Sequence, residues 1–142
     1  VGSSNANNGS GRNMIAYCFA EKTGYSKFGS YTGNGSADGT FFYTGFKPAF
    51  CIIKRVDTTD DWLMVDNKRV GYNGGQYYLL ANTSDNEDGG AGDRVDILSN
   101  GLKMNNSWSK INASGGTYIY MAFAENPLVA NSGTNGVPAT AR

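Results

Sequence analysis

The chain has 142 residues, a length that suits one domain with a buried core. Its 12 basic and 12 acidic residues balance, which argues against a surface that binds nucleic acid or enters an anionic membrane. Histidine is absent, so the residue type that most often acts as a general base or a metal ligand is missing. Twenty glycines and nine tyrosines are typical of a protein made of strands and turns.

The first 13 residues are polar and rich in Gly, Ser and Asn, and we interpret them as an arm or linker. Because the chain begins with Val1 and shows no signal-peptide pattern, we expect it to be a piece of a longer polypeptide or a processed chain. A strand is expected at residues 14–21. This strand contains Cys18, and the other cysteine, Cys51, also lies in an apolar run; whether the two form a disulfide is left open.

Short runs of aromatic and β-branched residues, separated by turn residues, predict further strands. They lie at residues 26–31, 40–44, 49–56, 62–66, 76–81, 94–98, 102–104 and 117–125. The run at 49–56 (AFCIIKRV) is the most apolar and predicts a central, buried strand. A hairpin turn is expected at residues 73–75 (NGG), a long polar loop at 82–93, and an extended surface tail at 127–142.

No segment has the apolar periodicity of a helix, and the strands recur every ~8–12 residues, as in β-sandwiches. We therefore predict an all-β fold, an antiparallel β-sandwich of jelly-roll type over residues 14–126. No apolar run approaches the ~20 residues of a membrane span.

One segment is nearly repeated: MIAYCFAE at residues 14–21 and YIYMAFAE at residues 118–125. With an offset of 104 residues, six of fourteen positions match, including the pairs Phe19 and Phe123, and Glu21 and Glu125. Two strands can resemble each other by chance, but the match includes turn residues and favours an internal duplication. The first copy would then be the last strand of a preceding repeat.

This first copy is expected either to cover an exposed sheet edge or to attach the domain to its predecessor. Deletion of residues 1–22 should then give an insoluble or unfolded product.

Several segments resemble a known group of sequences: residues 16–55 (AYCFAEKTGYSKFG to CIIKR), WLMVDNKR, DILSNGLKM and NASGGTYIYMAFAENP. They are similar to uncharacterised domains near the C-termini of large virion or tail-fibre-like proteins of marine phages. Those domains are similar in turn to concanavalin A-like (laminin-G or lectin-like) sandwiches. The resemblance implies a structural virion protein located on the particle surface, such as a fibre tip, an appendage or a capsid decoration.

Catalytic and metal chemistry find little support in the sequence. Without histidine, a Ser-His-Asp or Cys-His unit cannot be built. Carboxylates could still form a glycosidase pair, but they cluster in turns, and Glu21 and Glu125 end equivalent strands, which favours structural roles. Residues 84–89 (SDNEDG) match a calcium loop only loosely, because the first position is Ser84 and the bidentate Glu is missing. We predict no enzyme activity, no metal and no cofactor.

Binding of a host-surface glycan is the alternative function, because lectin-like pockets combine an aromatic ring with Asn, Asp and backbone donors. Tyr72, Asn73, Tyr77 and Tyr78 flank the predicted hairpin turn, and Trp108 lies in a polar loop. The predicted glycan-binding residues are Trp108, Tyr72, Asn73 and Tyr77.

Assembly is the function we favour. A neutral chain rich in strands suits packed fibres and shells, in which edge strands and tails link copies by main-chain hydrogen bonds. The tail beginning at Asn126, Pro127, Leu128 and Val129 is the predicted contact, together with the polar arm. The expected partners are further copies of the chain and other virion proteins.

Overall fold

The computed structural model describes residues 5, 9–69, 73–75, 77–89, 94–127, 129–130 and 137–138. Within these residues the chain forms eleven strands and one short helix. In order they are β1 (Ser26–Thr32), β2 (Phe41–Tyr43), β3 (Pro48–Arg55), β4 (Trp62–Asp66), β5 (Tyr77–Leu80), β6 (Asp88–Gly89), β7 (Val95–Leu98), β8 (Gly101–Met104), α1 (Ser109–Asn112), β9 (Thr117–Ala124), β10 (Val129–Ala130) and β11 (Val137–Pro138).

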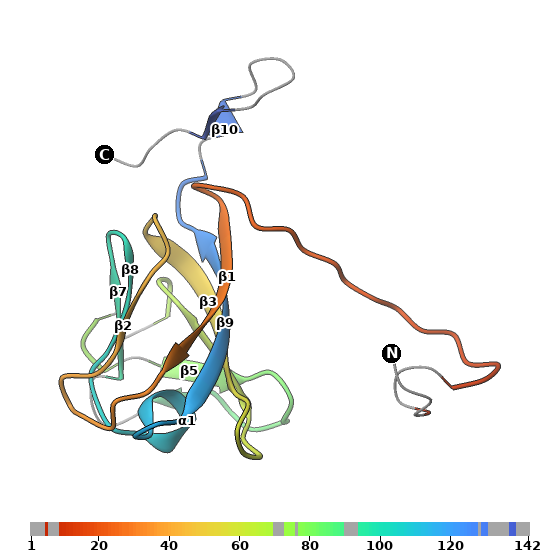
Figure 1. Ribbon diagram of the computed structural model, residues 1–142, viewed down its shortest axis with the longest axis horizontal. Coiled ribbons are helices and arrows are strands. Elements are labelled where there is room, and N and C mark those ends of the chain that lie inside the picture. The colour runs from red at the N-terminus through yellow and green to blue at the C-terminus, as the bar shows by residue number, and fades with distance from the viewer. Residues whose placement is uncertain are drawn as a thin grey trace.

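Two antiparallel sheets form the body of the molecule, as Figure 1 shows. The larger sheet has the strand order β1-β9-β3-β4-β5-β6, and the smaller has the order β2-β8-β7. The strand β9 lies between β1 and β3 and pairs with both along its length, with Tyr120 opposite Gly29 on one side and Ile53 on the other. The predicted all-β architecture with antiparallel sheets is thereby confirmed.

The core lies between the two sheets and follows the two-residue period of the strands. On β9, Tyr118, Tyr120 and Ala122 are buried, whereas Ile119 between them is exposed. The remaining buried side chains include Cys51, Ile53, Leu63 and Val65 from the large sheet and Val95, Ile97, Leu102 and Met104 from the small one.

Aromatic rings fill part of the space between the sheets. The ring of Tyr31 on β1 stacks on Tyr118 with 4.8 Å between centroids and on Phe42 of β2 with 4.9 Å. Phe42 in turn stacks on Tyr120 at 4.2 Å. The two contacts of Phe42 cross from one sheet to the other, so these rings fix both the spacing and the alignment of the layers.

The helix α1 was not predicted, because four residues are too few to show an apolar period. Its last residue, Asn112, is fully buried, and its side chain bonds the loop that follows β1. The amide Nδ2 donates to the carbonyls of Ser36 and Asn106, both at 2.9 Å, while Oδ1 accepts from the Asn34 backbone N–H at 2.9 Å. Gly33 packs against the same region, and a Cβ there would lie 2.3 Å from the Ala113 carbonyl oxygen.

The strand predicted at residues 14–21 is wrong. This stretch, which we call the AYCF segment, forms no strand and leaves the two sheets as an extended chain (Figure 1). The gap between β1 and β3 is filled by β9, so the first copy cannot take the place that its sequence matches. The two copies touch only through side chains, with the Phe19 and Phe123 rings 5.8 Å apart.

Two smaller expectations also change. The polar loop predicted at residues 82–93 contains β6, which pairs with β5 at the edge of the large sheet. The tail expected to run extended contains the antiparallel pair β10 and β11, with Val129 opposite Pro138. Short strands of two residues carry too little pattern to be recognised in a sequence.

The disulfide question is answered by the placement of the two cysteines. Both are free, with Cys18 exposed on the AYCF segment and Cys51 fully buried on β3. Burial raises the pKa of the Cys51 thiol, so little reactive thiolate forms there.

We predict that Asn112→Ala lowers the free energy of unfolding by about 1–3 kcal/mol, because it leaves buried backbone groups without partners. Urea denaturation measures this difference. The exposed Asn126→Ala is the control and should leave the midpoint unchanged. An equal effect of both substitutions would contradict the role assigned to Asn112.

We also predict that Ellman's reagent modifies one thiol of the native protein quickly and the second only after unfolding. In Cys18→Ser, no thiol should react until denaturant is added. Two fast thiols in the native protein would show that β3 is not packed as described.

Candidate functional site

Trp108, the first residue predicted to bind glycan, is half-buried and packs against the core. Its ring centroid lies 5.3 Å from that of Tyr78 on β5. The Arg94 guanidinium lies over both rings, 4.3 Å from the Trp108 centroid and 4.7 Å from the Tyr78 centroid. Cation–π contacts of this kind hold an aromatic pair in place and occupy ring surface that a sugar would need for stacking.

Two of the other predicted glycan residues, Asn73 and Tyr77, belong to the described part of the chain. Asn73 has a positive φ of 52°, and its side-chain amide bonds both backbone groups of Ile97: Oδ1 accepts from N at 2.7 Å, and Nδ2 donates to O at 3.0 Å. Tyr77 is half-buried and, as the neighbour of Tyr78 on one strand, points to the opposite face of the sheet. Tyr72 lies outside the described residues. The glycan-binding role of these residues stays a prediction.

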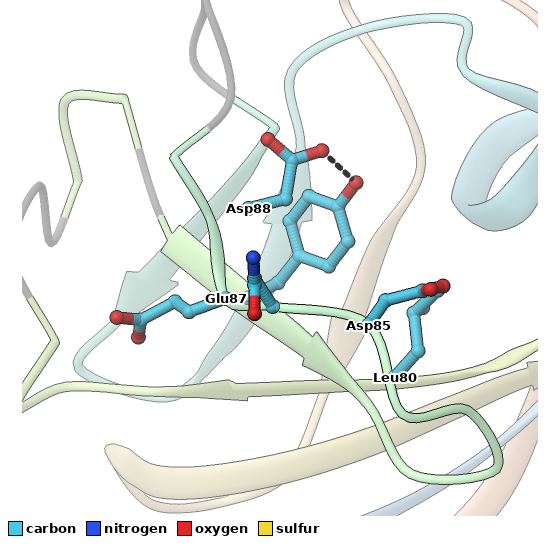
Figure 2. A pocket seen from close by; sticks show the side chains of 6 residues that line it. Leu80, Asp85, Glu87 and Asp88 are labelled. Carbon is cyan, nitrogen blue, oxygen red and sulfur yellow. Dashed lines mark hydrogen bonds between the residues drawn. The ribbon is translucent and has the colours of Figure 1, made fainter.

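An acidic hollow of about 390 Å³ opens beside Tyr78 (Figure 2). The Tyr78 hydroxyl donates a hydrogen bond to Oδ2 of Asp88, and burial together with this bond raises the pKa of Tyr78. Glu87 forms an ion pair with Arg69 at the same loop. The residues lining the hollow are Tyr78, Leu80, Asp85, Asn86, Glu87 and Asp88.

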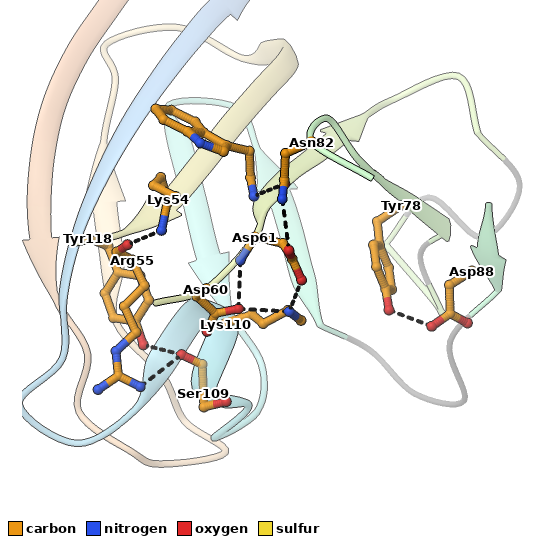
Figure 3. A network of polar contacts seen from close by, with 11 residues as sticks. Lys54, Arg55, Asp60, Asp61, Tyr78, Asn82, Asp88, Ser109, Lys110 and Tyr118 are labelled. Carbon is orange, nitrogen blue, oxygen red and sulfur yellow. Dashed lines mark hydrogen bonds and ion pairs between the residues drawn. The ribbon is translucent and has the colours of Figure 1, made fainter. Parts of the chain in front are cut away.

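A network of polar contacts ties α1 to the loop between β3 and β4 (Figure 3). The ammonium of Lys110 donates to Asp60 at 2.7 Å and to Asp61 at 2.5 Å. Asp61 also accepts from Asn82 Nδ2 at 2.9 Å. The hydrogen bond from Lys110, followed by that from Asn82, lowers the pKa of Asp61, so its carboxylate is charged and held.

The same network continues on the other side of α1 (Figure 3). The Tyr118 hydroxyl donates to the Ser109 carbonyl at 2.7 Å and accepts from the Ala113 N–H at 2.8 Å. Arg55 forms an ion pair with Asp57 at 2.7 Å. The charged groups named here are held by neighbours in their own chain, which is the pattern of a structural network. Within the described residues, no group of three or more His, Cys, Asp or Glu side chains is arranged to hold a metal ion.

The two repeated glutamates also form ion pairs. Glu125 follows β9 and accepts from Lys47 at 2.9 Å and from Asn67 at 2.7 Å. Glu21 accepts from Lys27 at 2.6 Å. In each case the hydrogen bond from the lysine lowers the pKa of the carboxyl group. The two carboxylates thus belong to separate ion pairs, Glu21 with Lys27 and Glu125 with Lys47.

The residues predicted for assembly lie beyond the end of β9. Asn126 and Pro127 are exposed, and the backbone of Val129 pairs within β10 and β11. Leu128 lies outside the described residues. Their contact with another copy stays a prediction.

A further surface was missed by the sequence interpretation: the face of the large sheet that points away from the small sheet, which we call the open face. Its middle is apolar and hollowed by about 350 Å³. Trp62 and Ile119 are 42% and 40% exposed there. The side chains that line the hollow come from β1, β3, β4 and β9 and include Phe28, Ile52, Trp62, Ile119 and Met121.

One end of the open face carries a cluster of aromatic rings centred on Phe123. Phe28 and Tyr25 meet its ring edge-on, with centroids 6.1 and 6.2 Å away. Phe19 of the AYCF segment and Phe50 of β3 complete the cluster at 5.8 and 6.5 Å. The signal for this face was present in residues 49–53, which are apolar at successive positions, as expected for a strand covered on both faces.

A family model described as a domain of unknown function (DUF7483) matches residues 1–127, and the chain belongs to this family. The match includes the AYCF segment and ends three residues after β9. No match was found among curated proteins or among solved structures. In the described part of the chain, no helix is long and apolar enough to cross a membrane.

The ion pairs of Glu125 predict a dependence of stability on pH. Because its folded-state pKa lies below the ordinary 4.5, the stability that it contributes is complete above that value and is lost as the pH falls below it. Thermal melting of Glu125→Gln should therefore depend less on pH than that of the wild type between about pH 5 and pH 3.

The exposed Asp85→Asn serves as the control, since it removes a carboxylate from a loop. If the melting temperatures of Glu125→Gln and of the wild type decrease by the same amount over this pH range, the ion pairs of Glu125 do not contribute to the acid sensitivity of the fold.

Proposed function

We propose that the domain is a non-catalytic structural module that self-assembles, of the jelly-roll, concanavalin A-like type, and that it forms part of a phage virion. The open face carries the proposal. It presents many aromatic and aliphatic side chains, among them Ile119 and Trp62 on either side of Lys54, where a soluble sheet facing water would present mainly polar ones. The virion context is supported by the resemblance of the sequence segments alone.

A second copy of the chain is the partner that fits this face. Two sheets pack face to face through apolar side chains at a spacing of about 10 Å, so an apolar sheet face can pair with a second copy of itself. The chain has no net charge, and two copies therefore do not repel each other as strongly charged proteins would. Symmetric self-association is also the commonest form of assembly.

Light scattering tests the proposal by comparing the mass of the wild type with that of Ile119→Lys. We expect the wild type to exceed one chain and Ile119→Lys to be monomeric, because a charge at the centre of the open face opposes its burial. Tyr43→Lys is the matched control: Tyr43 is 62% exposed on β2, in the small sheet, and its substitution should leave the mass unchanged.

Both variants should melt within a few degrees of the wild type, since both side chains lie on the surface. A monomeric wild type, or an equal loss of mass in both variants, would contradict assembly through the open face.

Carbohydrate binding is the second candidate, and the acidic hollow favours it. The exposed Asp85, Asn86 and Glu87 line the hollow together with Leu80 and Tyr78, and carboxylate and amide oxygens are the groups that hold sugar hydroxyls in lectin-like pockets. Binding on a glycan array that is lost in Asn86→Ala and kept in Ile119→Lys would support this function; an array without signal would contradict it.

A further inference from the structure

We propose that the AYCF segment of one copy pairs as a β-strand with the free edge of β1 in a second copy and so continues the large sheet across the contact. This inference rests on the proposed self-assembly and names the strand that makes it. The main contact between copies is then made by the AYCF segment and not by the tail that begins at Asn126.

The AYCF segment has the residue pattern of a strand but pairs with no strand in the described part of its own chain. Ile15 and Tyr17 are 83% and 82% exposed, and the segment leaves the sheets without a ladder hydrogen bond in the described residues (Figure 1). Exposed apolar side chains on an extended backbone that takes part in no ladder are the features of a segment that can pair with another chain.

The sequence of the segment indicates which strand it pairs with. It repeats β9, and β9 pairs antiparallel with β1 along seven positions, from Ser26 opposite Phe123 to Thr32 opposite Thr117. A strand of this pattern is therefore complementary to β1. One side of β1 is taken by β9. Because β1 ends the sheet, no strand of the described residues pairs with its other side, although Lys22 bridges Ser26 at the start of β1.

The segment does not suit the free edge of its own β1, because the connecting turn gives the wrong register. Lys22 and Ser26 form a bridge, with backbone bonds of 3.2 and 2.9 Å. Continuing this hairpin by three residues on each side would place Phe19 opposite Gly29. A side chain at Gly29 would point at Tyr120, on the core side of the sheet.

The Phe19 ring lies instead against Phe28 and Phe123, on the open face. A register error of one residue moves every side chain of a strand to the other face. The hairpin and the observed position of Phe19 are thus incompatible, and the segment departs from β1 just before the turn. A second copy imposes no such turn and can accept the segment in the register of β9.

In the register of β9, the two faces of the segment fit the two faces of the sheet. Ile15, Tyr17 and Phe19 correspond to Ile119, Met121 and Phe123, and they would continue the open face. The alternate residues, which include Ala16 and Cys18, correspond to the inward positions of β9, and small side chains suit the margin of a core.

Cys18 provides a direct test, because it is exposed and Cys51 is buried. Wild-type protein is mixed with a tagged variant that carries Cys18→Ser and Lys27→Cys, and disulfides between the two chains are counted after mild oxidation. Lys27 lies on the inward side of β1, opposite Ala122, so its replacement shares a face with Cys18. The control, Cys18→Ser with Ser30→Cys, places the thiol on the open face of the same strand.

We expect the Lys27→Cys chain to form mixed disulfides several-fold faster than the Ser30→Cys chain, because only side chains on one face can meet. Equal rates, or faster linkage of Ser30→Cys, would overturn the proposed pairing. The assay uses full chains throughout, and it detects contacts between copies only.

A proline in the segment provides a second test that does not depend on a thiol. Tyr17→Pro removes a backbone donor and fixes φ, so it blocks strand pairing. Because the segment lies outside the sheets, the melting temperature should not change, while the mass by light scattering should fall. Asn13→Pro, just before the segment, is the control and should behave as the wild type.

The outcomes separate this inference from the proposed function. A wild type that self-associates, with the same mass after Tyr17→Pro and no preference for Lys27→Cys, would overturn the pairing of the AYCF segment and leave assembly through the open face standing. A wild type that is monomeric at every concentration tested would overturn both.

Discussion

The pairing of β9 with β1 on one side and with β3 on the other is the constraint on which the rest of the structure depends. It joins β9, the last strand of the large sheet in the sequence, to β1 and β3, which come early in the sequence. The large sheet is therefore complete only when the chain is present as far as β9. The inward side chains Tyr118 and Tyr120 then reach the rings of Tyr31 and Phe42 and bring the small sheet into contact. The Tyr118 hydroxyl also fastens α1 through the Ser109 carbonyl.

The acidic loops gain their order from this arrangement. Once α1 is held against β9, Lys110 lies within reach of Asp60 and Asp61, and three segments that are distant in the sequence share one network. The hydrogen bonds lower the pKa of Asp61, so its charge is kept where the loop needs it. These carboxylates stabilise the connection between β3 and β4 through ion pairs and hydrogen bonds within the same chain.

Most strands could be predicted because turn residues and alternating apolar residues are local signals. The AYCF segment shows the limit of such signals. Its residue pattern matches that of β9, yet only one of the two can lie between β1 and β3. Local sequence patterns do not indicate which of them takes this place. The same holds for Trp108, whose loop looked exposed but whose ring lies beside Tyr78 under Arg94. Which of the neighbours Tyr77 and Tyr78 faces Trp108 depends on the face of the strand that each side chain takes, and Tyr78 is the one that meets the ring.

The strand β3 carries apolar side chains on both of its faces. A strand with this composition is normally covered on two sides, as in sheets packed between layers. In this domain the small sheet covers one side, with Cys51 and Ile53 fully buried, while Ile52 lies in the hollow of the other. In the described part of the chain, the residues that line this hollow all belong to the large sheet itself. The composition of β3 therefore fits the proposed contact through the open face, and the AYCF segment beside the same sheet fits the proposed extension of its edge.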